Sequence, residues 1–283
     1  MRGLKNSIWK NTFFVSSLVS IVSVLLIIIF MAANGVPAMI KIGFAEFLLG
    51  QKWKPEINLF GIFPMIAGSL VVTLGAIILG VPLGIFASVF LTRYIPNKYY
   101  KSYKFAINLL AGIPSVVFGF IGLTTIVPFI RSIAGGSGTS ILSASIVLAV
   151  MILPTIINVS ENSLRQLPPH YFAGSLALGA TKERSIFALE IKAAKSGIIS
   201  GVILGIGRAI GETMAVIMVA GNQAILPRGI FKGVRTMTAN IVLEMGYASG
   251  LHREALIATS VILFIFILII NSIFLVLKNK KKA

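Results

Sequence analysis

Two charged residues, Arg208 and Glu212, stand four positions apart inside the otherwise apolar stretch 197–219. On a helix, positions i and i+4 share one face, so the two side chains can pair. A guanidinium offers a planar fork of N–H donors that suits an oxyanion. A charge at the centre of a bilayer costs roughly 2.5–3.5 kcal/mol on insertion scales. We interpret the two residues either as a structural lock between helices, or as a substrate path in which Glu212 keeps Arg208 from binding an anion too tightly.

Patterns for catalysis and metal binding are missing from the sequence. The chain has no cysteine, which excludes disulfides, thiolate metal ligands and cysteine nucleophiles. It contains no GxxxxGK[ST] phosphate loop and no HExxH segment. The only histidines, His170 and His252, are predicted on opposite sides of a membrane, so they cannot share a metal. We therefore predict a protein that is not an enzyme, with no catalytic residues, no metal and no cofactor.

The composition is that of a polytopic membrane protein. Of the 283 residues, 57% are hydrophobic and 12% are charged, and a soluble domain carries about twice that charged share. Six apolar runs have about the length that a helix needs to cross a bilayer core. They predict an all-α fold with six transmembrane helices in one permease-like domain, 1–283, with spans at 12–33, 66–91, 105–130, 141–159, 197–219 and 255–277.

The distribution of basic residues predicts how the chain is oriented. The N-terminus, the 92–104 loop, the 160–196 loop and the C-terminal tail carry three, four, five and four of the 25 Lys and Arg residues. Because cytoplasmic loops of membrane proteins collect basic residues, both termini and the 160–196 loop are predicted to be cytoplasmic. The same rule accounts for the net charge of +17 without a nucleic-acid partner. We expect a multi-pass protein of the cell membrane, in contact with lipid.

Proline and glycine interrupt the third predicted span at Gly112, Pro114 and Ser115. Proline removes a backbone donor and clashes with the preceding turn. A helix break at membrane depth persists only where protein buries it or where it lines a wet cavity. The alternative is a kink that serves packing alone. In the second span, glycines such as Gly75, Gly80 and Gly84 predict close helix packing.

Two segments are expected on the outer side. Residues 35–60 predict a short interfacial helix anchored by Trp53. The outer cluster Arg228, Lys232 and Arg235 is interpreted as a solvated face, or alternatively as a surface that attracts anions or an acidic protein.

The 160–196 loop contains its own signals for helix starts and helix ends. Pro168 and Pro169 end the fourth helix, and residues 171–178 predict a short helix that ends at Gly179. Thr181 is a suitable N-cap for a second helix over 182–195. A helix, a glycine turn and a helix at the cytoplasmic face favour either docking to a partner or an amphipathic loop that rests on lipid headgroups.

Several blocks of the sequence resemble a known family. The 160–196 loop resembles the EAA loop of ABC-importer permeases, with Gly179 at the glycine position of that pattern. The blocks FLLGQKWKPEINLFGIFPMIAGSLVVT (47–73), GIPSVVFGFIGL (112–123), GIGRAIGETMAV (205–216) and GLHREALIA (250–258) are similar to the PstC-like permease subunits of ABC-type phosphate importers. Together they cover most of the chain beyond the first helix.

The resemblance implies a type I ABC importer permease for phosphate that works with a second, PstA-like permease subunit, two ATPase subunits and an external phosphate-binding protein. It also departs from the family pattern, because Ala173 stands at the EAA glutamate and Lys192 at the terminal proline. Coupling to the ATPase is therefore expected to depend on shape and on the glycine turn. The residues implied in ATPase coupling are Tyr171, Ala173, Gly174, Ser175, Leu178, Gly179 and Ala180.

Three alternatives stay open. A sulfate or molybdate permease would keep the Arg-x-x-Gly-Glu segment, but Phe-Gly typically follows its Glu, where this chain has Thr213 and Met214. An ion-coupled carrier or channel that acts alone is disfavoured because Glu212 is the only acid predicted inside the membrane. A purely structural membrane anchor is disfavoured by the charges within the fifth span.

Overall fold

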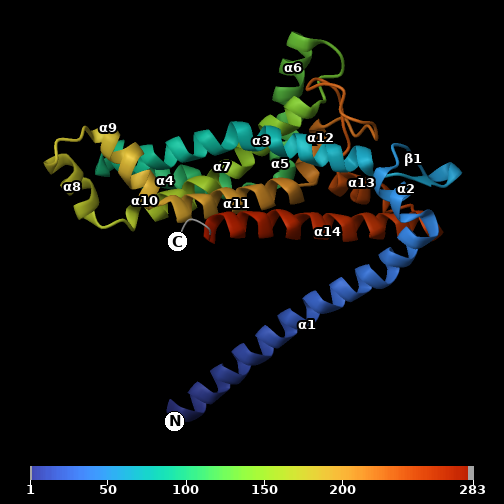
Figure 1. Ribbon diagram of the computed structural model, residues 1–283, viewed down its shortest axis with the longest axis horizontal. Helices are drawn as coiled ribbons and strands as arrows, with labels where there is room; N and C mark the ends of the chain where they lie inside the picture. Colours follow the sequence, from blue (N-terminus) through green and yellow to red (C-terminus); the bar gives the residue numbers. More distant parts are fainter. Residues whose placement is uncertain (1, 280–283) are drawn as a thin grey trace.

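The computed structural model describes residues 2–279 of the chain, so the basic tail beyond Asn279 lies outside the described residues. The described chain is a bundle of long helices with one very small antiparallel sheet (Figure 1). Five helices are long and apolar enough to cross a membrane, at 9–42, 63–94, 115–134, 141–165 and 250–273 within the described residues. This is the all-α membrane fold expected from the composition, although the predicted set of six spans differs in detail.

The N-terminal helix α1 (Arg2–Ile42) runs well past the expected span 12–33. It leaves the bundle at an angle (Figure 1), and its C-terminal part packs on α14 (Gly250–Asn279). A Cβ atom on Gly35 would lie 2.9 Å from Val261 Cγ2 and 3.0 Å from the Ala258 Cα, so glycine permits this approach.

A short helix is present within the predicted segment 35–60, but the predicted lipid anchor Trp53 lies outside it. Residues beyond α1 form α2 (Phe44–Leu49) and a hairpin of β1 (Trp53–Lys54), η1 (Pro55–Ile57) and β2 (Leu59–Phe60), with Trp53 opposite Phe60. Trp53 is buried, with its ring 5.6 Å from that of Phe60 and its Nε1 donating to Glu244 at 2.8 Å. Since its polar atom is satisfied within the protein, Trp53 is a packing residue instead of a lipid anchor.

The centre of the bundle is the pair α3 (Phe63–Val89) and α7 (Ile141–Arg165). A Cβ atom on Gly80 would lie 2.9 Å from Ile152 Cδ1, and one on Gly84 would lie 2.7 Å from Ile156 Cγ2. The glycine-rich second span therefore packs closely, as expected. Around this pair lie α5 (Ser115–Ile121), α11 (Lys195–Gly211) and α12 (Met214–Val219), which contribute to the same buried cluster.

The third predicted span is divided where proline was expected to divide it. After α3 the chain forms the π-helical turn η2 (Phe90–Tyr94) and then α4 (Asn97–Gly112), which is a separate helix. The membrane-length helix starts only at Ser115 and comprises α5, η3 (Gly122–Ile126) and α6 (Val127–Ala134). The span at 105–130 is therefore wrong in its first ten residues.

The fourth and fifth spans also differ from expectation. Helix α7 continues to Arg165 instead of ending at 159, because neither glycine nor proline occurs between Val159 and Pro168. The fifth span is not one continuous helix, because α11 stops at Gly211, Glu212 is extended (φ −70°, ψ 130°) and α12 starts at Met214. The prediction of a single helix over 197–219 is therefore wrong.

The ends of the bundle hold different connections (Figure 1). One end carries α8 (Pro169–Ala177), α9 (Lys182–Arg184), η4 (Ser185–Glu190) and α10 (Ile191–Ala193). The other end carries the hairpin and α13 (Met237–Glu244). Both described chain ends point toward the α8 end, and His170 and His252 lie at opposite ends. The arrangement is consistent with the sidedness expected from the charges.

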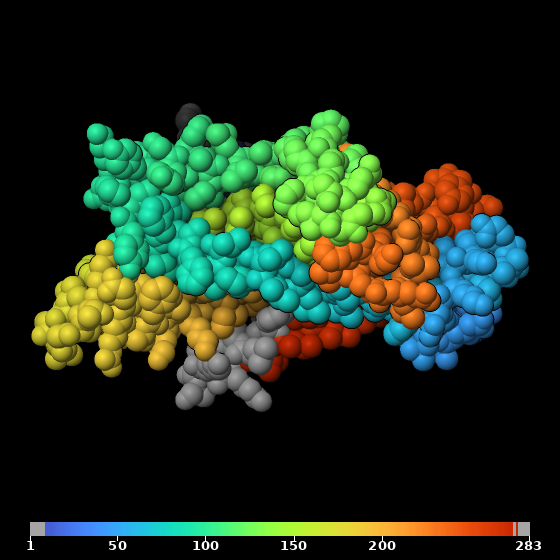
Figure 2. Space-filling model, turned by 90° about the horizontal axis from the view of Figure 1, so that it is seen from above, coloured from blue at the N-terminus to red at the C-terminus, as the bar shows by residue number. Residues whose placement is uncertain are grey.

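The long connection between α12 and α13 is folded onto the start of α7. The amide of Ser140 donates to Val219 O at 3.0 Å, and the amides of Ile141 and Leu142 donate to Lys232 O and Ile230 O at 3.0 and 2.9 Å. Figure 2 shows this connection, in orange, packed beside the light green segment that includes α6. The connection is therefore an ordered cover over one side of the bundle.

Candidate functional site

Two interrupted helices lie side by side in the bundle. Helix α5 packs on α12, with a Cβ on Gly119 placed 2.8 Å from the Ala215 Cα and one on Gly122 placed 3.0 Å from Val219 Cγ1. Because both contacts advance in the same direction along both helices, α5 and α12 are parallel. Each starts just after a break in its chain, so the two breaks lie at a similar level.

The first break is the one predicted from proline. Helix α4 ends at Gly112, Ile113 and Pro114 are extended, and α5 starts at Ser115. A Cβ atom on Gly112 would meet nothing within 4 Å among the described residues. The chain is thus interrupted by extended residues, which is more than a kink in a continuous helix. No ligand contact tests the role of Gly112, Pro114 and Ser115, which stays a prediction.

The second break is closed by the side chain of Glu212. Its Oε1 accepts from the amides of Thr213 at 3.1 Å and Ala215 at 3.3 Å. The hydroxyl of Thr238, from α13, donates to the Glu212 carbonyl at 3.2 Å. The first amides of a helix have no partner inside the helix, and here the carboxylate takes that place at α12. Sequence reasoning did not predict this break, because Gly211 alone does not require one.

Arg208 is half-buried on α11, and its Nη1 donates to Thr155 Oγ1 of α7 at 3.4 Å. Arg208 and Glu212, both within the described chain, form no ion pair with each other. The predicted pairing is therefore wrong, because the helix ends at Gly211 and the i, i+4 geometry is lost. A Cβ on Gly207 or Gly211 would meet nothing within 4 Å of the described chain. The Arg208 guanidinium thus has N–H donors without a partner among the described residues, on a helix whose Gly207 and Gly211 border open space.

The predicted coupling residues gather on one exposed helix and turn. Leu178 follows α8 with its side chain 90% exposed, and Gly179 has φ +84°, the left-handed conformation expected of it. The Ala180 amide donates to Ser175 O at 3.1 Å and closes the turn. A groove of about 430 Å³ beside this turn is lined by Tyr171, Gly174, Ser175, Leu178 and Ala180 together with His170, Arg184, Ser185, Ala188 and Leu189. Ala173 and Gly179 are exposed outside that lining.

The helix that follows the turn starts as predicted. Thr181 Oγ1 accepts from the Arg184 amide at 3.3 Å, so Thr181 is the N-cap of α9. Ser185 then bonds Ser175 Oγ at 2.7 Å and the Thr181 carbonyl at 2.9 Å. These bonds hold α8 and η4 together as one unit.

An ion pair anchors this unit to the bundle, and sequence reasoning missed it. Glu190 of η4 is fully buried and accepts from Arg93 of η2 through both carboxylate oxygens, with Nε–Oε2 at 2.7 Å. The Arg93 guanidinium also lies 5.3 Å from the centre of the Phe172 ring of α8. The expectation that coupling depends on shape and the glycine turn stays a prediction, to which the structure adds this ion pair.

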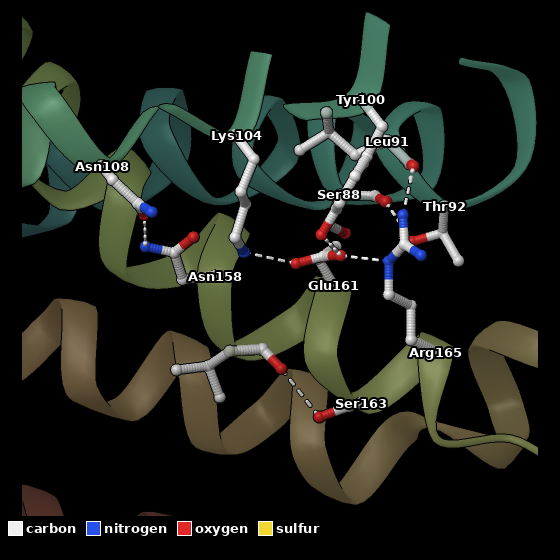
Figure 3. A network of polar contacts seen from close by, with 11 residues as sticks. Ser88, Leu91, Thr92, Tyr100, Lys104, Asn108, Asn158, Glu161, Ser163 and Arg165 are labelled. Atoms are coloured by element: carbon white, nitrogen blue, oxygen red, sulfur yellow. Dashed lines mark hydrogen bonds and ion pairs between the residues drawn. The ribbon is translucent and has the colours of Figure 1, made fainter. Parts of the chain in front are cut away.

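A second buried carboxylate joins α4 to α7 (Figure 3). Glu161 is fully buried and forms ion pairs with Lys104 and Arg165, and it accepts from Tyr100 Oη at 2.8 Å. The Arg165 guanidinium lies 3.9 Å from the centre of the Tyr100 ring. Burial first, and then the hydrogen bond to Glu161 and its charge, raise the pKa of the Tyr100 hydroxyl. Since α4 buries no residue of its own, this network is a principal attachment of α4.

The structure separates Arg235 from the other two residues of the outer basic cluster. Arg235 forms an ion pair with Glu244 of α13, whose other oxygen contacts Trp53 and His252, both at 2.8 Å. Arg228 and Lys232 are exposed. The interpretation of three solvated cations is therefore wrong for Arg235, which serves the packing of β1, α13 and α14.

The fold, with its two interrupted membrane helices and its exposed helix on a glycine turn, is that of an ABC importer permease. A solved inward-facing structure of the MetNI methionine ABC transporter matches with a TM-score of 0.60 and 21% identity, over 81% of this chain and 99% of that chain. A solved bacterial ABC transporter for the import of alginate matches with a TM-score of 0.60 and 14% identity, over 96% of this chain and 98% of that chain.

The chain belongs to the family of binding-protein-dependent transport system inner membrane components, which its residues 80–282 match. The probable ABC transporter permease protein YqgH of Bacillus subtilis (strain 168) is 39% identical, over 90% of this chain and 86% of its own length. The phosphate transport system permease protein PstC of Mesorhizobium japonicum is 32% identical, over 83% of this chain and 78% of its own length. The chain is thus a multi-pass membrane permease subunit of an ABC importer.

Proposed function

We propose that this chain is a permease subunit of an ATP-driven importer that carries phosphate across the cell membrane. The cargo is supported by the relatives named as phosphate transport permeases. The observation that carries the proposal is Arg208, a half-buried residue within an apolar helix whose guanidinium has one hydrogen-bond partner among the described residues and whose neighbours Gly207 and Gly211 border open space. A guanidinium can donate two parallel hydrogen bonds to two oxygens of one phosphate.

Transport also needs partners, in line with the family. We infer a PstA-like second permease, two ATPase subunits that hydrolyse ATP, and an external phosphate-binding protein. A cytoplasmic position of the α8 end is supported by the basic residues of the connections there. The exposed Leu178 and the groove beside α8 are then available to an ATPase subunit.

Movement at α8 has two routes into the membrane. One runs through η4 and α10 into α11 and so to Arg208, with a bend at Ala194 between α10 and α11. The other runs through the Glu190–Arg93 ion pair into η2 and α3. Because Ser175 and Ser185 bind each other, α8 and η4 move together, and a displaced α8 displaces both routes.

Replacing Arg208 with Gln tests the proposed path. Gln keeps a polar amide for Thr155 but removes the charge and the fork, so we expect phosphate uptake to fall to background while the complex still assembles. The measurement is uptake of radioactive phosphate by cells in which this permease is the only route. Uptake equal to that of the unchanged chain, at equal expression, would remove Arg208 from the path.

A sulfate or molybdate importer is the alternative within the same class, since the Arg208 fork suits any tetrahedral oxyanion. Competition with sulfate distinguishes the two kinds of importer, because phosphate uptake by a phosphate permease complex does not fall in excess sulfate. Omitting the ATPase subunits tests for a carrier or channel that works alone, because such a chain would still transport its substrate without them.

A further inference from the structure

We propose that a polar strip on α7, formed by Thr155, Asn158 and Asn162 with Asn108 of α4, lines the inner part of the anion path. The strip leads from Arg208 toward the α8 end of the bundle. The inference rests on the proposed function and extends it, since it names the residues that receive the anion after Arg208.

The strip starts at the bond that Arg208 makes. Thr155 accepts from Arg208 Nη1 at 3.4 Å. Asn158 and Asn162 follow at i+3 and i+7, which places the three side chains on one face of α7. At 1.5 Å per residue they extend for roughly 10 Å along the helix axis. The strip therefore continues from the level of Arg208 and lies within the candidate span Ile141–Arg165.

Some polar atoms of the strip form no hydrogen bond with the described residues. Asn158 Nδ2 donates to Asn108 Oδ1 at 3.2 Å (Figure 3), while Asn158 Oδ1 is buried and has no hydrogen-bond partner among them. Asn162 is exposed on the same face. An unsatisfied buried amide at membrane depth costs free energy. A passing hydrated or protonated oxyanion would satisfy it.

The charges around the strip suit passage instead of retention. Lys104 lies one turn from Asn108 on α4, and its ammonium is neutralised by Glu161. The strip itself thus offers amides and a hydroxyl without a net charge. A conducting path has to bind an ion firmly enough for entry and weakly enough for release. After the single cation Arg208, a neutral polar strip meets that condition.

Single cysteines provide a direct test, because the chain has no cysteine of its own. We would make Thr155→Cys, Asn158→Cys and Asn162→Cys in the assembled complex and treat inside-out vesicles with a membrane-impermeant, anionic thiol reagent. The matched control is Ser160→Cys, which is nearly isosteric and fully buried on the same helix, against Gly201 of α11. We expect all three strip cysteines to react at least tenfold faster than the control.

Inorganic phosphate is the probe for the ligand. At several times its dissociation constant it should slow labelling of the strip about fivefold, since the free fraction falls as 1/(1 + [L]/Kd). Labelling as slow as that of Ser160→Cys, or labelling that phosphate does not change, would overturn the inference.

A second measurement separates this inference from the proposed function. Asn158→Leu is expected to lower phosphate uptake at least fivefold with ATP hydrolysis retained, and Asn158→Ser is expected to restore most of it. If Arg208→Gln abolishes uptake while Asn158→Leu leaves it unchanged, the strip is excluded and the proposed function stands. If Arg208→Gln leaves uptake unchanged, the proposed path itself fails.

Discussion

Three of the eight glutamates, Glu161, Glu190 and Glu244, are buried, and each pairs with an arginine. Each also joins separate elements: Glu161 joins α7 to α4, Glu190 joins η4 to η2, and Glu244 joins α13 to β1 and α14. Three of the eight acidic residues thus hold separate elements together at the ends of the bundle. Arg208 and Glu212, inside the fifth predicted span, remain as candidates for the anion path.

The Glu190–Arg93 pair gives a prediction at this scale. Glu190→Gln removes the charge that compensates Arg93, whose side chain is only 24% exposed, so we expect a loss of about 3 kcal/mol, the usual cost of breaking a buried ion pair. The measurement is the thermal unfolding of the purified chain. Glu254→Gln is the matched control, because its partner Lys41 is 60% exposed and such pairs contribute less than about 1 kcal/mol. Equal losses in the two variants would show that the Glu190 pair is no anchor.

At the residue scale, the sequence predicts which charges matter better than it predicts their partners. Arg208 and Glu212 stand out because charges are rare in apolar stretches, and both lie at a break or beside open space. Their mutual pairing could not be predicted correctly, since it assumed an unbroken helix. Arg93 and Glu190 are 97 positions apart, and no local pattern joins them. The surrounding apolar residues of 185–194 were the one available signal that Glu190 is buried.

We propose that coupling to the ATPase depends on α8 with its glycine turn. Gly179 has φ +84° and open space around it, so a side chain there is strained by backbone conformation alone, at about 1–2 kcal/mol. Gly179→Trp is expected to leave the fold intact and to shift the α8 surface, so that ATP hydrolysis continues while uptake is lost. The ratio of phosphate transported to ATP hydrolysed measures this uncoupling.

Gly136 provides the matched control for that variant. It has φ +70°, and a Cβ there would also meet nothing within 4 Å of the described chain, but it lies in the loop between α6 and α7, away from α8. Gly136→Trp should therefore carry similar strain without uncoupling. Normal coupling in Gly179→Trp, or equal uncoupling in both variants, would contradict the role of the α8 turn.

Helix existence was predictable and helix bounds were less so. The break at Pro114, the turn at Gly179 and the cap at Thr181 follow from local backbone chemistry, and the structure contains all three. The break at Glu212 depends on a side chain that replaces the helical partners of α12, and on Thr238 from a distant element. The hairpin around Trp53 likewise depends on Glu244, so hydropathy alone suggested an interfacial helix.

At the scale of the molecule, the chain exposes more apolar surface than one subunit can cover. Helix α1 diverges from the bundle and leaves its apolar side chains exposed over most of its length (Figure 1). Gly207 and Gly211 border open space on α11, next to Arg208. We propose that lipid and the inferred second permease subunit cover this surface, and that the second subunit completes the proposed path at the Arg208 face.

The class of membrane protein could be predicted for the whole molecule, because it follows from the apolar runs summed over the chain. The sidedness expected from the placement of basic residues stays a prediction. The sequence could not indicate which helices touch. That α5 lies on α12, with their two breaks at a similar level, depends on small residues such as Gly119 and Ala215, which meet across almost 100 positions.

The most direct test of the account is phosphate transport into proteoliposomes that contain this chain with its partner permease, the ATPase subunits and the binding protein. We expect phosphate uptake that requires ATP and the ATPase subunits, persists in excess sulfate and disappears with Arg208→Gln. Phosphate movement through the chain in the absence of the ATPase, or transport of sulfate in place of phosphate, would contradict it.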